Sequence, residues 1–433
     1  MDGTRAGRIF AALSEAEGDL PPEEARNGLR HVLSLSMTKL ADGLINPKLV
    51  LAWLAQALGV GQQDAIPTQA LGAPALLVGL LVPIREAGAL LPQMLLAGRV
   101  RAMRHRKWAW VIGSLGQGVA AAGMVAVALT LQDWAAGIAM CALLAMLALS
   151  RAASSVSYKD VLGKTVQKTR RGAVTGTAAS VASAGVILFA LLLMSGLIEN
   201  TSALTAAVAL AALLWVAAGA LFSRLEEAPS EEDGSAPAID LRPFRDDPQF
   251  RRFVYARGAL TATALAPPYI VLLDTGEGAL QKLGALVLAS AAASFASSYV
   301  WGRLADRSSR RVLMLSGFSG AAALALAALA GLTGWAGGAI WVTPVLLFGL
   351  MVAYHGVRQG RSTYLVDMAP ESDRASYAAL ANTLIGALLL VSGAFGGALA
   401  WIGPVAALAG FAALACLGGL VAAGLHEVER SDD

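Results

Sequence analysis

ALTAAVALAALLWVAAGALFS, residues 203–223, is a run without a single charged side chain. A helix of about 20 apolar residues spans the roughly 30 Å hydrocarbon core of a bilayer. The segment that follows, RLEEAPSEEDGSAPAIDLRPFRDDPQFRR at 224–252, mixes Pro, Ser and Gly with charges of both signs. Such a composition is typical of a flexible linker in water. The border at residue 223 therefore predicts a membrane span that leads into a cytosolic linker.

Similar apolar runs occur along the whole chain. Each is about 20 residues or longer and lies between polar loops, which is the pattern of membrane helices and not that of barrel strands. The linker divides them into two sets of six. We therefore expect an all-α membrane protein with two six-helix bundles related by pseudo-twofold symmetry. The predicted spans are 32–60, 71–97, 108–131, 134–155, 173–197, 203–223, 253–273, 281–301, 312–334, 338–364, 375–399 and 403–424.

The composition excludes most other classes of protein. Hydrophobic residues make up 56% of the chain and charged residues only 15%, and the mean hydropathy is +0.61, so a soluble, disordered or disulfide-rich protein is excluded. Cys141 and Cys416 lie inside apolar runs, where a thiol serves as a packing residue. The sequence lacks the motifs of zinc peptidases, serine hydrolases and nucleotide-binding loops. We expect no enzyme activity, metal or cofactor, and a net charge of +3 gives no reason to expect nucleic acid.

The distribution of Lys and Arg predicts the orientation. With both termini in the cytoplasm, 28 of the 33 basic residues fall on the cytoplasmic side, Lys282 falls on the opposite side, and four lie inside spans. Basic residues concentrate on the cytoplasmic side of membrane proteins. We expect a multi-pass protein of the plasma (inner) membrane. Its predicted parts are a cytosolic leader at 1–30, bundles at 31–223 and 253–425, the linker at 224–252 and a cytosolic tail at 426–433.

The two halves repeat a loop motif. GRVRAMRHRK at 98–107 matches GRLADRSSRR at 302–311, and Arg151 and Asp160 match Arg358 and Asp367 at an offset of 207. Internal repeats of this kind are common in transporters. The motif residues that we select are Gly98, Arg99, Gly302, Asp306, Arg307, Arg310 and Arg311.

The second copy of this motif resembles the loop signature of the major facilitator superfamily, Gly-x-Leu-Ala-Asp-Arg-x-Gly-Arg-Arg. Ser309 replaces the second glycine of the signature, and Ala102 stands where the first copy would need its aspartate. The resemblance implies a carrier that works by alternating access, in which Asp306 helps to hold the cytoplasmic gate shut. The alternative for these charges is that they only set the topology.

Ionisable residues inside the first two spans mark a candidate transport pathway. Lys39, Asp42 and Asn46 fall on one helical face near mid-membrane, and Pro47 predicts a kink directly after them. Arg85 and Glu86 lie in the second span, so Asp42 can face Arg85, or Lys39 can face Glu86. These groups are either structural ion pairs, or Asp42 or Glu86 carries a proton during the transport cycle.

The tenth span adds Tyr354, Arg358 and Arg361 on one face, together with His355. We interpret Arg257 and Arg151 as lying near the inner ends of their spans, where long side chains reach the membrane surface. The candidate cavity is therefore electropositive, which favours an anionic solute. The predicted partners are a small anion, protons and the lipid bilayer, and we expect a monomer. A drug or metabolite efflux antiporter and a non-transporting membrane scaffold are the alternatives.

Overall fold

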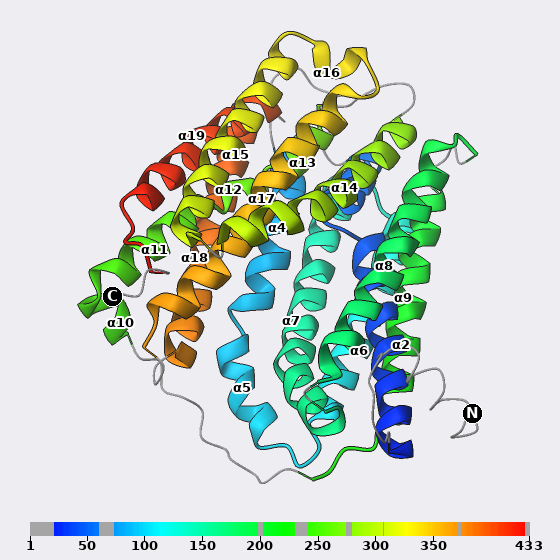
Figure 1. Ribbon diagram of the computed structural model, residues 1–433. Coiled ribbons are helices and arrows are strands. Elements are labelled where there is room, and N and C mark those ends of the chain that lie inside the picture. Colours follow the sequence, from blue (N-terminus) through cyan, green and yellow to red (C-terminus); the bar gives the residue numbers. More distant parts are fainter. Residues whose placement is uncertain are drawn as a thin grey trace.

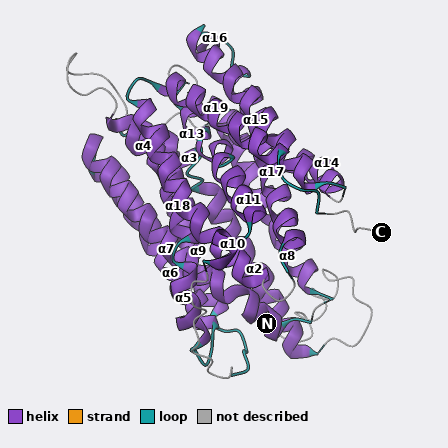
Figure 2. Ribbon diagram, turned by 90° about the vertical axis from the view of Figure 1, so that its left-hand side faces the viewer, coloured by secondary structure: helices purple, strands orange, loops and turns teal. Residues whose placement is uncertain are grey.

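The computed structural model describes residues 21–59, 73–167, 169–197, 202–229, 241–273, 279–305, 307–370 and 374–428. Within these ranges the chain is helical and forms no strand (Figure 1, Figure 2). The helices of the N-terminal half are α2 (Pro22–Leu44), α3 (Val50–Ala57), α4 (Ala73–Leu90), α5 (Gln93–Arg101), α6 (Lys107–Thr130), α7 (Asp133–Thr165), α8 (Arg171–Met194) and α9 (Ser202–Phe222).

The C-terminal half follows the same order of long helices. It contains α10 (Arg242–Asp246), α11 (Pro248–Ala259), α12 (Ala262–Leu265), α13 (Pro267–Val271), α14 (Ala279–Ala305), α15 (Ser309–Leu332), α16 (Trp335–Gly338), α17 (Val342–Met368), α18 (Arg374–Ala400) and α19 (Pro404–Ala423). The prediction of an all-α protein with two helical bundles is confirmed.

The helices extend beyond several of the predicted boundaries. α2 begins at Pro22, ten residues before the predicted span, and α7 continues to Thr165, ten residues beyond its predicted end. Residues 242–252, which we expected to belong to the flexible linker, form α10 and the first turn of α11. These extensions are polar, so hydropathy marks only the part of each helix that lies in lipid.

Eight of the described helices are long and apolar enough to cross a membrane, namely α6, α7, α8, α9, α14, α15, α18 and α19. The other four predicted spans fall on α2–α3, α4–α5, α11–α13 and α17. Three of these are broken into shorter helices, and α17 carries charged residues in its inner part. Breaks and charges inside a membrane are tolerated where they line a cavity, so these four spans are the ones to search for a site.

The break in the first span is the one that Pro47 predicts. α2 ends at Leu44 and α3 starts at Val50. The Asn46 side chain accepts a hydrogen bond from the backbone N–H of Lys48 at 2.9 Å. Pro47 has no backbone N–H to donate, so the helix is interrupted there. The Asn46 side chain then accepts from the Lys48 N–H, which has no helical acceptor at the break. The kink is therefore confirmed, and it fixes the position of Lys48.

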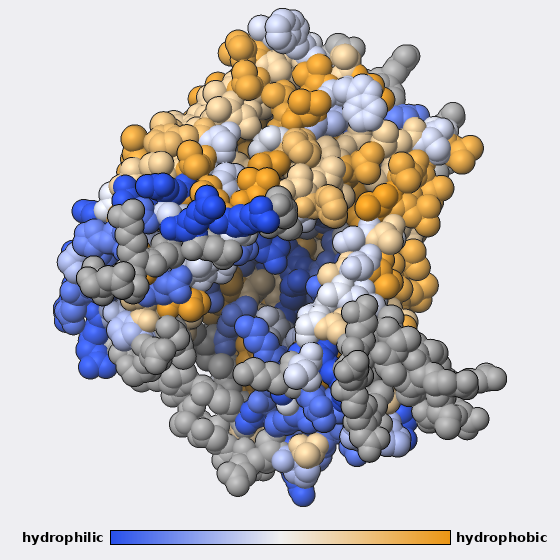
Figure 3. Space-filling model, in the orientation of Figure 1, coloured by the Kyte–Doolittle hydropathy of each residue, from blue (hydrophilic) through white to orange (hydrophobic). Residues whose placement is uncertain are grey.

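The outer surface is apolar. Large hydrophobic side chains on the membrane helices are exposed, and Figure 3 shows hydrophobic residues over much of the upper part of the molecule. A soluble protein would bury such residues, whereas lipid solvates them. Examples with more than half of the side chain exposed are Ile112, Val119, Leu188, Leu213, Leu326, Val391 and Leu420.

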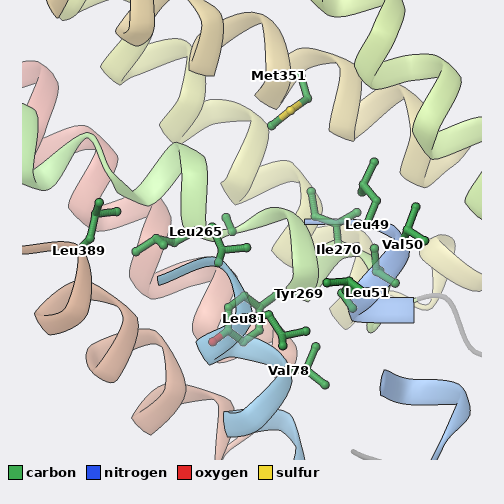
Figure 4. Packing of buried hydrophobic residues seen from close by; sticks show 14 of the residues in the cluster. Leu49, Val50, Leu51, Val78, Leu81, Leu265, Tyr269, Ile270, Met351 and Leu389 are labelled. Atoms are coloured by element: carbon green, nitrogen blue, oxygen red, sulfur yellow. The ribbon is translucent and has the colours of Figure 1, made fainter. Parts of the chain in front are cut away.

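The two halves meet through α4 against α18 and α8 against α14. Glycines allow this close approach, because a side chain at Gly393 would collide with Pro83 and one at Gly284 with the backbone of Ala190. Figure 4 shows the apolar contact that joins them, in which Leu81 of α4 lies beside Tyr269 of α13. We call this end of the molecule the closed end.

The basic loops lie at the opposite end, toward which the two halves diverge in Figure 1. We call it the basic end. In the N-terminal half the Glu227 carboxylate accepts hydrogen bonds from the backbone N–H groups of Arg106 and Lys107 at 3.0 and 2.8 Å. This carboxylate caps the N-terminus of α6 and stabilises it through hydrogen bonds and the helix dipole.

The C-terminal half repeats this cap with Ser308 and Glu427. The Ser308 hydroxyl accepts from the backbone N–H of Arg311 at 3.1 Å and donates to Glu427 at 2.6 Å. Arg310 and Arg311 approach the same carboxylate at 3.5 and 3.8 Å. The two halves therefore repeat a contact at this end as well as a helix order.

Candidate functional site

A cavity of about 1010 Å³ lies between the two halves. Its walls come from α2 and the break after it, and from α4, α7, α8, α14 and α17. Figure 3 shows hydrophilic residues within the hollow that separates the halves. The structure brings all nine predicted pathway residues to this cavity. They are Lys39, Asp42, Asn46, Arg85, Glu86, Tyr354, His355, Arg358 and Arg361.

Asp42 is held by two guanidinium groups. Arg85 Nη2 of α4 donates to Asp42 Oδ1 at 2.6 Å, and Arg151 Nη1 of α7 donates to Asp42 Oδ2. Of the two pairings that the sequence allowed, Asp42 with Arg85 is the one that forms. Each carboxylate oxygen therefore accepts a charge-assisted hydrogen bond. The three groups together carry a net charge of +1.

Lys48 links the two halves across the cavity. Its Nζ atom lies 4.0 Å from Glu86 Oε1 and 3.6 Å from the centre of the Tyr354 ring on α17. A cation over an aromatic face is attracted by the negative face of the ring. Lys48 replaces Lys39 as the ion-pair partner that we considered for Glu86. The Glu86 side chain remains 39% exposed, so it has one loose ion pair and access to the cavity.

The wall formed by α17 differs from the opposite one. Arg358, Arg361 and His355 line the cavity, and no carboxylate in the described ranges lies within ion-pair distance of either arginine. Lys39 on α2 likewise has no carboxylate within ion-pair distance among the residues that the structure places, and Asp42, the carboxylate nearest in sequence, pairs with Arg85 and Arg151 instead. These cations face a space that an anion could fill.

The cavity therefore has a net positive charge. Its lining contains six cationic side chains and two carboxylates, a formal charge of +4 with His355 neutral. Charges that line a concave, low-dielectric site raise the local concentration of solutes of the opposite sign. The cationic side chains are Lys39, Lys48, Arg85, Arg151, Arg358 and Arg361, and the carboxylates are Asp42 and Glu86.

Two interpretations of single arginines are wrong. Arg151, which we placed at the inner membrane surface, lines the cavity and binds Asp42. Arg257 is 5% exposed and donates from Nη2 to Asn382 Oδ1 at 3.1 Å, so it does not extend to the membrane surface. Arg151, Arg358 and Arg361 were counted with the cytoplasmic loops but line the cavity, so 25 of the 28 basic residues remain on the cytoplasmic side. The excess of basic residues on that side over the opposite side remains large.

The sequence contained a signal for Arg151 but hardly any for Lys48. Arg151 matches Arg358 in the internal repeat, and the structure places both at the cavity, one from each half. Lys48 lies just beyond the helix break, where helical spacing no longer predicts the direction of a side chain. A repeat is therefore informative about pore-lining residues even where hydropathy places them at a span end.

The loop motif lies at the basic end. Gly98 and Arg99 are near the C-terminus of α5, Gly302 is near that of α14, and Arg307, Arg310 and Arg311 surround the start of α15. Asp306, to which we assigned the gate, lies outside the described residues. In this loop, Ser308 and Arg310 contact the carboxylate of Glu427, which follows α19, and these contacts connect the loop to the end of α19.

Comparison with known proteins identifies the relatives of this fold. A crystal structure of a variant of the nucleoside transporter NupG superposes with a TM-score of 0.71 at 11% identity, covering 92% of this chain and 100% of that one. A D-xylose-proton symporter gives 0.67 at 13% identity, covering 93% and 98%. The xylose transporter XylE from E. coli, in a partially occluded inward-open conformation, gives 0.65 at 12% identity, covering 94% and 99%. No curated protein matches the chain.

These likenesses establish the fold, since every identity is low. The sequence itself matches the family model of the Major Facilitator Superfamily over residues 32–357, about three quarters of the chain. That range contains both loop motifs and the described cavity-lining residues except Arg358 and Arg361. The resemblance of the loop motif and the repeated architecture agree with this match. The chain is a multi-pass membrane transporter that belongs to the Major Facilitator Superfamily.

Proposed function

We propose that this protein carries a small anionic solute by alternating access and couples the transport to protons. The observation that supports the anion is the wall of α17, where Arg358 and Arg361 face the cavity without a carboxylate partner among the described residues. Guanidinium groups bind carboxylates and phosphates through paired, charge-assisted hydrogen bonds. A cationic drug would meet repulsion in the same place, which argues against a cationic-drug antiporter. The central cavity itself argues against a scaffold.

The coupling group in this proposal is Glu86. Asp42 is held by two arginines and acts as their counter-ion, whereas Glu86 has one ion pair at 4.0 Å and faces the cavity. Protonation of Glu86 removes the negative charge that opposes Lys48, so the cavity then binds one more anionic charge. Entry of a proton therefore favours binding of the solute, which is the requirement for symport.

The proposed cycle uses the closed and basic ends as alternating gates. The halves pack at the closed end and diverge toward the basic end, which we assign to the cytoplasm because basic residues concentrate there. Both termini then lie in the cytoplasm and the protein resides in the inner membrane. One chain forms the whole cavity, so we expect a monomer to be active.

The charge of the solute is tested with two series of six-carbon ligands whose members are negatively charged, neutral or positively charged. Gluconate, glucose and glucosamine form one series, and hexanoate, hexanol and hexylamine form a second one without hydroxyl groups. We expect only an anionic member to raise the melting temperature of the purified protein, and its uptake into liposomes to increase when the outside is acidic. Equal stabilisation by neutral or cationic members would overturn the proposal.

The orientation is tested by thiol labelling of intact cells. Gln132 and Arg104 are exposed at opposite ends of the molecule. In a variant without Cys141 and Cys416, an impermeant reagent should label Gln132→Cys from outside and leave Arg104→Cys unlabelled. The reverse result would show that the basic end faces outward. Asp64 and Glu199, in the loops that we expect to face outward, lie outside the described residues.

A further inference from the structure

A second, smaller hollow of about 500 Å³ adjoins the central cavity between α14 and α17. We call it the side pocket. It shares Ser294, His355, Arg358 and Arg361 with the central cavity, and it adds Ser297, Trp301, Gln359 and Ser362. The added residues lie nearer the basic ends of α14 and α17, so the side pocket extends from the central cavity toward that end.

Ser297 is the observation that points to a ligand. Its side chain is 2% exposed, it lines the side pocket, and its hydroxyl has no hydrogen-bond partner in the part of the chain that the structure describes. A buried hydroxyl that stays unpaired loses its hydrogen bonds to water without compensation. A ligand that donates to or accepts from Ser297 Oγ would recover this loss.

The aromatic part of the pocket wall, one turn beyond Ser297 on α14, is rigid. Trp301 is 8% exposed and donates from its indole N–H to the backbone oxygen of Val352 at 2.8 Å. Gly356 leaves room for the ring against α17, since a side chain there would collide with it. The Trp301 donor is therefore used within the protein. The Ser297 hydroxyl, which has no partner among the described residues, is left to bind a ligand beside this fixed aromatic ring.

We propose that the side pocket binds an uncharged, hydroxylated part of the solute while Arg358 and Arg361, at the junction of the two cavities, bind its anionic group. The solute is then a hydroxylated organic anion, such as a sugar acid or a sugar phosphate. This inference rests on the proposed function and specifies its substrate class. An alkyl anion would satisfy the arginines but would leave the buried Ser297 hydroxyl without a partner.

The first experiment varies the hydroxyl groups at constant charge. Gluconate and hexanoate have the same number of carbons and one carboxylate, and glucose 6-phosphate and hexyl phosphate form the matched phosphate pair. We expect the hydroxylated member of at least one pair to bind about threefold to tenfold more tightly to the purified protein, as one or two net hydrogen bonds imply. Ser297→Ala and Gln359→Met should each reduce this preference. Ser290→Ala is the matched control, because Ser290 lies on α14 and lines only the central cavity.

The second experiment reports occupancy of the pocket directly. The chain has two cysteines, Cys141 and Cys416, which are replaced by alanine, and Ser297→Cys or Ser290→Cys is then introduced. The better-binding hydroxylated anion should slow the reaction of a neutral maleimide with Ser297→Cys more than its alkyl partner does. At Ser290→Cys, both anions should slow the reaction alike at concentrations that give equal occupancy.

The outcomes separate this inference from the proposed function. If hydroxylated and alkyl anions bind equally well, and both depend on Arg358, the side pocket does not select the solute and only the inference fails. If no anion of either series binds, the proposed function fails and the inference fails with it. If a hydroxylated anion binds more strongly than its alkyl partner and Ser297→Ala does not change this preference, the hydroxyl groups bind outside the side pocket. That result would also overturn the inference.

Discussion

The two walls of the central cavity differ in the number of their charges, six on the N-terminal wall and two on the C-terminal wall, and in how these charges are paired. On the N-terminal wall, Asp42 holds Arg85 and Arg151, and Glu86 pairs with Lys48. On the C-terminal wall, Arg358 and Arg361 have no carboxylate within ion-pair distance in the described ranges. Paired charges stabilise a protein, and charges left for a ligand bind it. In the function that we propose, the first wall maintains the site and couples it to protons, and the second wall binds the solute.

The largest effect is expected from Asp42→Asn, which leaves two cavity arginines without their counter-ion. The loss of unfolding free energy should lie near the lower end of about 3–5 kcal/mol, because the Arg151 side chain is 37% exposed to the cavity. Melting temperature and expression would report it. Adding Arg85→Gln to this variant should recover part of the stability. A normal melting temperature of Asp42→Asn would show that the wall does not depend on the pair.

Arg358→Gln should instead weaken binding of the anion and leave the fold intact. A charge-assisted hydrogen bond contributes about 1.5–3 kcal/mol, which corresponds to about 10- to 150-fold in affinity for the anion. The melting temperature without solute should not fall, since no carboxylate is left unpaired among the described residues. Arg358→Lys should retain part of the affinity. A destabilised Arg358→Gln protein would mean that this wall, too, is held by its charges.

Glu86→Gln distinguishes coupling from structure. If Glu86 carries the proton, the variant should lose accumulation driven by a pH gradient while exchange of solute across the membrane continues, because exchange needs no net change of protonation. Uptake and exchange are measured in the same liposomes. A variant that still concentrates its solute against a gradient would remove Glu86 from the coupling mechanism. Loss of both activities with a lower melting temperature would assign it to the structural pairs.

The smallest effect is expected for an ion pair at the basic end, in water. Glu226 pairs with Arg26 and Arg30 at 3.1 and 3.2 Å, and their hydrogen bonds, that of Arg26 foremost, lower the pKa of the Glu226 carboxyl. Because the pKa of Glu226 is lower in the folded state, the ion pairs stabilise the protein fully at a pH above the ordinary pKa of glutamate. The protein loses this stabilisation as the pH falls through the folded pKa.

Because the Glu226 side chain is 42% exposed, Glu226→Gln should cost less than about 1 kcal/mol near neutral pH, and nothing in strong acid. Melting temperatures measured against pH, with and without salt, provide the test. A cost as large as that of Asp42→Asn would show that burial does not distinguish the two kinds of pair.

Sequence reasoning located the cavity residues because charges are rare in membrane helices. Lys39, Asp42, Arg85 and Arg358 each interrupt an apolar run, and mid-membrane charges are retained only where they are paired or face water. The same reasoning misplaced Arg151 and Arg257, since distance along a helix does not show which way a side chain points. Ser297 and Trp301 gave no signal at all, because buried serine and tryptophan are ordinary in membrane helices.

The sequence by itself determined that the protein lies in lipid, where its membrane spans fall along the chain, and that the two halves repeat. These depend on the hydropathy of whole segments and on local residues such as Pro47, which needs no tertiary partner to break a helix. Only the tertiary structure decided which charges pair. Lys48 meets Tyr354, and Arg151 meets Asp42, because helices far apart in sequence pack side by side, and the direction of each side chain across that contact is a property of the packed bundle.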